Sequence, residues 1–178
     1  MMLFEYQKGD REWLSAIIDN FSVLKAAKYD LCILASSVKG FGYKKDIHIW
    51  IRKEDYENAN LMILLSYIIL GHPDWKKGQI KIFATFPKES LKQEEQNLIE
   101  LTSTGRLPIS ANNIVVLPID ENIKRVDLIN QYSNDADLTL LGFHESMVKM
   151  ENGIEIFERY HKLGNILFVN TLTSKFIK

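Results

Sequence analysis

The chain has 178 residues, of which 46% are hydrophobic and 25% charged, so it can bury a core as one globular domain or slightly more. Its formal net charge of −1 argues against nucleic-acid binding, which needs clustered positive charge against phosphate. The single cysteine, Cys32, excludes an internal disulfide framework and fits a reducing compartment.

The first predicted helix spans residues 10–28, with Asp10 as its cap, because an aspartate oxygen can accept from the free N–H groups of the first turn. Apolar residues then recur at helical spacing on one face, at Leu14, Ile17, Ile18, Phe21 and Leu24. A short buried strand is predicted at 31–35. The loop 36–45 is too short for a crossover helix, so this strand is not expected to be a parallel neighbour of the next one. It either forms a hairpin or closes a preceding half-domain together with the helix.

The centre of the chain, residues 46–86, changes its apolar period twice. It begins with a period of two, typical of a strand, with isoleucines at Ile47, Ile49 and Ile51. Residues 60–70 are almost continuously apolar and predict a buried helix, ended by Gly71 in a left-handed turn and by Pro73. Residues 79–86 form a second strand. A crossover of this length predicts a βαβ unit with parallel strands.

The second half of the chain alternates strands with helices. Strands are predicted at 114–117, which Pro118 stops, at 137–142 and at 166–169. Helices are predicted at 90–104, with Ser90 and Gln93 as a capping box and Gly105 as the end, at 120–132, capped by Asp120, and at 150–163, ended by Gly164. This alternation predicts an α/β fold, a doubly wound and mostly parallel sheet with helices on both faces, like that of universal stress proteins.

Several segments resemble the cytosolic C-terminal domain of the cation–chloride cotransporters, the membrane transporter family that contains the sodium–potassium–chloride group. The matching segments are Ile47-His48-Ile49-Trp50, 61–70, Trp75-Lys76-Lys77, Ile80-Lys81-Ile82-Phe83, 136–141 and 166–169. They lie between about residues 44 and 171 and are structural rather than catalytic. Two features depart from the family. Residues 53–58 replace its usual acidic-then-glycine turn, and the long polar insertion that animal members have before the penultimate strand is absent.

The resemblance implies a non-catalytic regulatory and dimerisation domain on the cytoplasmic side of the cell membrane, in a prokaryotic member of the family. Its implied partners are a second copy of the chain and the membrane domain of the parent transporter, with no cofactor. Because the family domain contains two similar α/β halves, the resemblance favours a division into 1–43, the end of a preceding half-domain, and 44–178. The chain itself is not expected to span a membrane, since the stretch 61–70 falls short of the roughly 20 apolar residues required.

A truncated half-domain would leave the apolar face of the first helix without part of its cover. An exposed stripe of this kind is larger than the apolar patches that monomers usually leave bare, and pairing two copies would bury it. We therefore expect a dimer face at Leu14, Ile17, Ile18, Phe21 and Leu24. The competing expectation is that the helix folds back on its own sheet and leaves no patch.

Open α/β sheets bind ligands beyond the carboxyl ends of their strands, near a switch in strand order. The segments there predict a ligand crevice at Arg52, Asn58, Gly142 and His144. They contain no recognisable catalytic spacing, and Glu158 with His161 matches a surface pair better than a metal site. We therefore assign no catalytic residue, cofactor or metal ligand from the sequence.

Two nucleotide-binding patterns are incomplete. The loop at Gly40 and Gly42 lacks the third glycine of a dinucleotide fingerprint and precedes a strand instead of a helix. The strand that ends at Gly142 is similar to one in universal stress proteins, but the glycine-rich turn that would hold phosphates is absent. The alternatives to a cotransporter domain are a stand-alone universal-stress-like nucleotide-binding protein and a small α/β enzyme whose site is unassigned.

Overall fold

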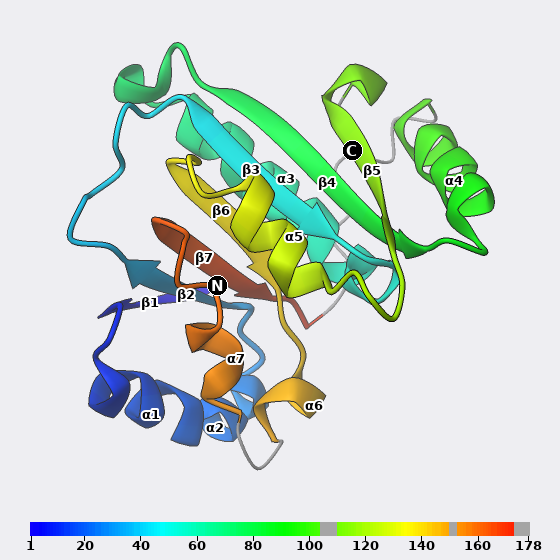
Figure 1. Cartoon of the computed structure of the whole chain (residues 1–178). Coiled ribbons are helices and arrows are strands. Elements are labelled where there is room, and N and C mark those ends of the chain that lie inside the picture. Colours follow the sequence, from blue (N-terminus) through cyan, green and yellow to red (C-terminus); the bar gives the residue numbers. More distant parts are fainter. Residues whose placement is uncertain (104–109, 150–152, 173–178) are drawn as a thin grey trace.

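The computed structural model of the chain describes residues 1–103, 110–149 and 153–172. The described residues form a seven-stranded sheet in the order β1-β2-β7-β6-β3-β4-β5 (Figure 1). Its strands are β1 (Met2–Gln7), β2 (Leu31–Ser36), β3 (Asp46–Ile51), β4 (Gln79–Pro87), β5 (Ile114–Ile119), β6 (Leu138–Gly142) and β7 (Asn165–Asn170). Strands β2 and β7 are antiparallel, whereas the other neighbouring pairs are parallel. The predicted mostly parallel α/β sheet is confirmed.

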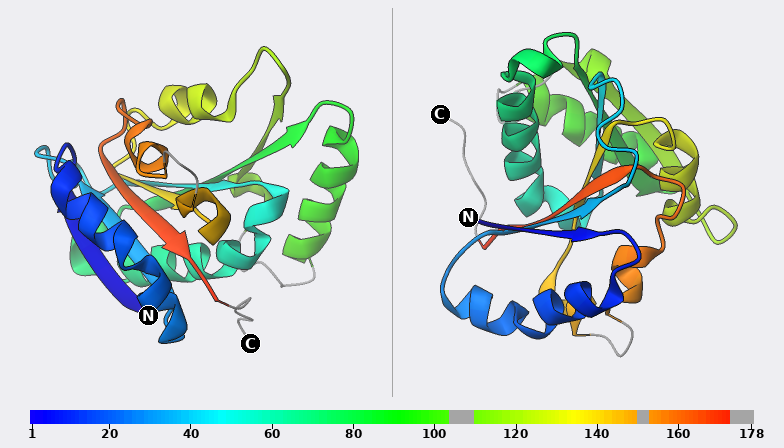
Figure 2. Two further views of the ribbon diagram at one scale, coloured as in Figure 1. Left: turned by 90° about the horizontal axis from the view of Figure 1, so that it is seen from below. Right: turned by 90° about the vertical axis from the view of Figure 1, so that its left-hand side faces the viewer.

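Helices cover both faces of this sheet, as Figures 1 and 2 show from three directions. Helices α3 (Tyr56–Leu70) and α4 (Leu91–Ser103) pack on one face. The other face carries α1 (Arg11–Asp19), α2 (Phe21–Ala26), α5 (Arg125–Tyr132), α6 (Glu145–Val148) and α7 (Glu155–Glu158). The two apolar cores between sheet and helices confirm the doubly wound architecture.

The central βαβ unit was predicted correctly. Strands β3 and β4 are parallel neighbours, and the three isoleucines of β3 enter the core beneath α3. Helix α3 begins at Tyr56, earlier than predicted. The predicted start missed a first turn whose polar residue Asn58 is buried, at 1% exposure, while Glu57 faces solvent. The left-handed turn predicted at Gly71 is wrong. Gly71 has φ −67° and is right-handed, and the extended residue His72 then leads into a short 3-10 turn, η2 (Pro73–Trp75).

The first predicted helix consists of two helices that break at Asn20, so a single helix over 10–28 is wrong. The side-chain amide of Asn20 donates to Ala16 O. Local bonds of this kind compete with the backbone hydrogen bonds of a regular helix. The predicted cap is confirmed, since Asp10 Oδ1 accepts from Trp13 N at 3.0 Å. Strand β1, which precedes the helices, was not predicted.

The apolar stripe of these two helices is covered, so the expectation that it is exposed is wrong. Leu14, Ile17, Ile18 and Phe21 are buried and Leu24 is partly buried, all within the core between the helices and their own sheet. Strand β2 pairs with β1 and β7, and not with β3, as expected for the first predicted strand. The segments 1–43 and 44–178 therefore contribute to one sheet, and a domain boundary between them stays a prediction.

Several boundaries in the second half differ from their predictions. Strand β5 continues through Pro118, because it is an edge strand, where the missing N–H of proline is tolerated. Asp120 Oδ1 accepts from the N–H groups of Asn122 and Ile123, so it caps a turn ahead of α5 rather than the helix itself.

The remaining differences concern helices. Ser90 Oγ donates to Pro87 O instead of forming the expected capping box. The helix predicted over 150–163 is wrong. The described part of the segment holds the short α7 instead, followed by a turn, and a second short helix, α6, precedes it. Gly105 lies outside the described residues, as do 150–152.

Candidate functional site at the carboxyl ends of β3 and β6

The strand order switches direction at β3. The chain runs from β3 outward to β4 and β5, then returns to β6 on the other side of β3. Such a switch separates the loops that follow two neighbouring parallel strands, and in this fold class it is the usual place for a ligand. Here the loops are the segment after β3, with the 3-10 turn η1 (Lys53–Asp55), and the segment after β6 that leads into α6.

The centre of this place is occupied by the carboxylate of Asp55, which has 0% exposure. Its Oδ2 atom lies 3.0 Å from Arg52 Nε and 3.4 Å from Arg125 Nη2. Its Oδ1 atom lies 3.0 Å from His144 Nε2. A buried carboxylate is costly unless donors surround it, and here donors from three elements meet both oxygens.

Asn58 and Gly142 complete the same cluster. Asn58 Nδ2 donates to Phe143 O at 3.3 Å, and its Oδ1 accepts from Thr171 N at 2.8 Å. A Cβ atom at Gly142 would lie only 2.8 Å from Asp55 Oδ1, so glycine is what allows the carboxylate to approach β6. The structure thus brings together all four residues of the predicted crevice, but with a side chain of the protein itself between them.

Two residues of the cluster, Asp55 and Arg125, were missed by sequence reasoning. Arg125 begins α5 and also donates to Trp50 O at 3.3 Å, so it connects that helix to the end of β3. Burial lowers the pKa of Arg125, and the nearby Asp55 carboxylate opposes that shift. The acidic turn at 53–58 was a signal for Asp55. No local sequence pattern pointed to Arg125, because its position in the cluster depends on how α5 packs.

A second hollow of about 730 Å³ lies at the carboxyl ends of β4 and β5. Segments 87–89 and 119–125 line it, and among them Lys88 pairs with Asp120. Its lining also includes charges of both signs, Glu89 and Glu121 together with Lys124 and Arg125. Since these charges offset one another, the hollow is not an evident cradle for an anion.

The glycine loop before β3 is also occupied from within the chain. Gly40 and Gly42 are left-handed, with φ +61° and +50°. The carboxylate of Asp137 accepts from the backbone N–H groups of Tyr43 at 2.8 Å, of Lys45 at 2.7 Å and of Asp46 at 3.0 Å. The amides that a phosphate would need are therefore already bound to a carboxylate.

The histidines do not converge. His48 is buried opposite the isoleucines of β3, where Ser133 Oγ lies 2.9 Å from its Nδ1 atom and accepts from Trp50 Nε1 at 2.8 Å. Burial, followed by the charge of Lys81, lowers the pKa of His48 to about 4. Glu158 forms an ion pair with Arg11 at 3.1 Å. Within residues 1–103, 110–149 and 153–172, no three His, Cys, Asp or Glu side chains cluster as a metal site would require.

Comparison with known proteins gives a match in structure but not in sequence. No protein family model and no curated protein matches the chain. The cytoplasmic domain of a prokaryotic cation chloride cotransporter superposes with a TM-score of 0.59 over 95% of this chain and 62% of that one, at 17% identity. The chain has the fold of that domain.

A functionally unknown protein from Pseudomonas aeruginosa superposes with a TM-score of 0.53, at 14% identity, over 93% of this chain and 62% of its own. The chain thus spans less than two thirds of each of these solved chains. The resemblance noted in the sequence and the structural comparison agree at the level of the fold. Among the described helices, none has the length and apolar character that crossing a bilayer requires.

Proposed function

We propose that this chain is a non-catalytic domain on the cytoplasmic side of a cation–chloride cotransporter-like membrane protein, where it pairs with a second copy and regulates transport by the parent membrane domain. The observation that carries this proposal is the superposition of 95% of the chain on a cotransporter cytoplasmic domain. The sequence resemblance between about residues 44 and 171 points to the same family.

The filled switch point supports a regulatory rather than a catalytic role. Catalysis needs a place where a substrate atom can approach reactive groups, whereas Asp55 occupies this one and engages Arg52, Arg125 and His144. These contacts hold three elements, η1, α5 and the segment before α6, in one arrangement. A domain that transmits a mechanical state to a membrane partner benefits from such a rigid junction.

Pairing of two copies needs an exposed apolar surface, and the stripe first expected to supply it is buried. The outer side of α3 offers another. Leu64 and Ile68 lie one helical turn apart there and are 36% and 62% exposed. A two-fold pairing along α3 would cover both copies of this row.

Sedimentation of the purified chain over a concentration series tests the pairing. We expect a dimer that Ile68→Glu converts to a monomer and that Val23→Glu, an equally exposed change on α2, leaves intact. A chain that stays at 20.6 kDa up to high micromolar concentration would remove the pairing claim.

The genomic context tests the remainder of the proposal. An open reading frame that continues upstream of codon one with about a dozen spans of ~20 apolar residues would support it. Rubidium uptake by cells that produce the complete protein, compared with a version lacking residues 1–178, then measures the regulatory effect. A separate reading frame with no membrane spans, or identical uptake by the two versions, would contradict the proposal.

A further inference from the structure

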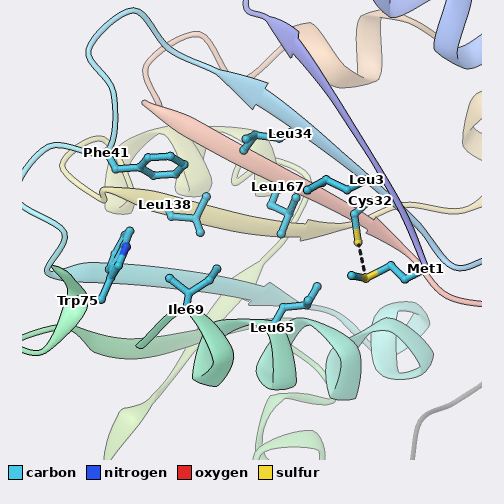
Figure 3. A pocket seen from close by; sticks show the side chains of 10 residues that line it. All are labelled: Met1, Leu3, Cys32, Leu34, Phe41, Leu65, Ile69, Trp75, Leu138 and Leu167. Atoms are coloured by element: carbon cyan, nitrogen blue, oxygen red, sulfur yellow. Dashed lines mark hydrogen bonds between the residues drawn. The ribbon is translucent and has the colours of Figure 1, made fainter. Parts of the chain in front are cut away.

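An apolar pocket of about 270 Å³, partly open to solvent, lies between the sheet and the flank of α3 (Figure 3). Ten side chains line it, and none is charged. Helix α3 packs against β3, β6 and β7, whereas β1 and β2 extend beyond its flank on this face. The pocket forms where the sheet is wider than the helix that covers it.

The shape of the pocket is elongated. Leu34, Leu138 and Leu167 form a wall from three strands, and Leu65 and Ile69 of α3 form the opposite wall (Figure 3). An apolar cavity offers water no hydrogen-bond partners, so it stays dry or binds an apolar molecule. An engineered cavity of roughly 150 Å³ in another protein already holds benzene. The lining side chains extend in two rows from the aromatic rings to Met1 and Cys32 (Figure 3), an arrangement that suits an extended hydrocarbon chain.

One end of the pocket is formed by aromatic rings. Phe41 and Trp75 meet edge to face there, with ring centroids 6.0 Å apart. The other end is formed by Met1 and Cys32, whose sulfur atoms lie 3.6 Å apart.

The chain segments at the aromatic end are basic. Lys76 and Lys77 directly follow Trp75, and Lys39 and Lys45 lie in the loop that holds Phe41; all four are exposed. The acid in these segments, Asp74, is already paired with Lys44. A charged group at this end of a bound molecule would therefore be favoured if it were negative.

We propose that this pocket binds the hydrocarbon chain of an anionic amphiphile, of which a medium-chain fatty acid is the simplest, with its head group beside Lys76 and Lys77. The apolar walls select the chain, and the lysines select the sign of the head group. If each carbon of the chain needs ~30 Å³, which is the volume of a water molecule in the liquid, the pocket holds a chain of roughly eight to ten carbon atoms. This inference does not depend on the proposed role in a transporter.

Calorimetric titration of the chain with fatty acids of six to fourteen carbons, below their micelle concentrations, tests the hydrocarbon part. We expect about fourfold tighter binding for each added methylene up to about ten carbons, and no further gain beyond that. Leu34→Trp should abolish binding by filling the pocket. Val23→Trp, at an exposed site on α2 on the other face of the sheet, should not. Near-ultraviolet circular dichroism confirms that both variants are folded.

The head group is tested with chain-matched probes. Decanoate should bind several-fold more tightly than decanol, and decanol more tightly than decylammonium. The double variant Lys76→Glu/Lys77→Glu should reverse this order while decanol binding stays unchanged. Absence of binding, equal binding by Leu34→Trp, or affinity that does not depend on chain length would overturn the proposal. The proposal would also be overturned if decanoate bound the monomer but not the dimer, because a second copy of the chain would then occupy the pocket.

Discussion

Asp55 Oδ1 lies 3.0 Å from His144 Nε2, and this contact joins the segment after β3 to the segment after β6 across the switch in strand order. The other oxygen of the same carboxylate is held by Arg52 and Arg125. One acidic side chain thus fastens together parts of the chain that are far apart in sequence.

Asp55→Asn keeps the size of the side chain but removes its charge. Arg125 then loses its ion pair, and Arg52 keeps only the exposed Glu54, whose Oε2 lies 3.7 Å from Arg52 Nε. Breaking a buried ion pair on one side is costly, so we expect the free energy of unfolding to fall by about 3 kcal/mol. Urea unfolding measures the change. Asp74→Asn is the matched control, because its pair with Lys44 is exposed, and its midpoint should hardly move. Equal midpoints for the two variants would contradict the structural role of Asp55.

Gly142→Ala places a methyl group where there is no room for one. The new Cβ would lie 2.8 Å from Asp55 Oδ1 and 3.0 Å from Asn58 Nδ2, both of which are fixed by other contacts. Overpacking of this kind should lower the free energy of unfolding by about 1–3 kcal/mol. At Gly164 a new Cβ would lie 3.6 Å from Ala136 O, an ordinary van der Waals distance, so Gly164→Ala should have little effect. A Gly142→Ala protein as stable as the parent would mean that the cluster relaxes freely.

The buried His48 should make stability depend on pH. Its pKa is about 4 in the folded chain and near 6.5 when unfolded, so between these values the unfolded state binds the extra proton. Stability therefore rises with pH from about 4 to 6.5, by up to about 3 kcal/mol. Urea unfolding at pH 4.5 and pH 7.5 measures this difference. His48→Gln should show a correspondingly smaller one, and an unchanged difference in the variant would assign the effect to other groups.

Purine nucleotides should not stabilise the fold. Asp55 occupies the switch point, and Asp137 already binds the amides of the glycine loop. A ligand present at 100 times its dissociation constant would add roughly 2.7 kcal/mol. Thermal unfolding with and without millimolar MgATP should therefore give the same midpoint. A rise of several degrees that Gly142→Ala removes would favour a universal-stress-like nucleotide-binding protein instead.

The thiol of Cys32 should be unreactive in the folded chain. Burial raises its pKa to about 12, with a further contribution from Asp30, so at neutral pH the reactive thiolate is about a thousandfold rarer than in an exposed cysteine. Reaction with a chromogenic disulfide reagent should be slow in buffer and fast in denaturing urea. Fast reaction in both conditions would show that the pocket next to Cys32 opens readily.

The central part of the fold could be predicted from the sequence because its signals are local. The alternation of Ile47, Ile49 and Ile51 and the apolar run that follows specify strand and helix without reference to distant residues. The same applies to the cap at Asp10. The topological rule for open sheets then selected Arg52, Asn58, Gly142 and His144, which do lie together.

What could not be predicted depends on contacts between distant segments. The stripe at Leu14 to Leu24 has the same pattern whether it faces a second copy or its own sheet, and the pairing of β2 with β7 determines which. Arg125 reaches Asp55 only because α5 packs over the end of β3. Its position as the first residue of a helix gives no indication of that contact.

The antiparallel pairing of β2 with β7 has a consequence for the newly made chain. Leu31 pairs with Asn170, so the neighbour of β2 is synthesised long after β2 itself. At 5–20 residues per second the ribosome needs on the order of ten seconds to reach it. Two strands alone are marginally stable in water, so until then β1, β2 and the stripe of α1 lack a finished sheet to pack on. The nascent chain is therefore most open to chaperones, and to aggregation, before its last strand emerges.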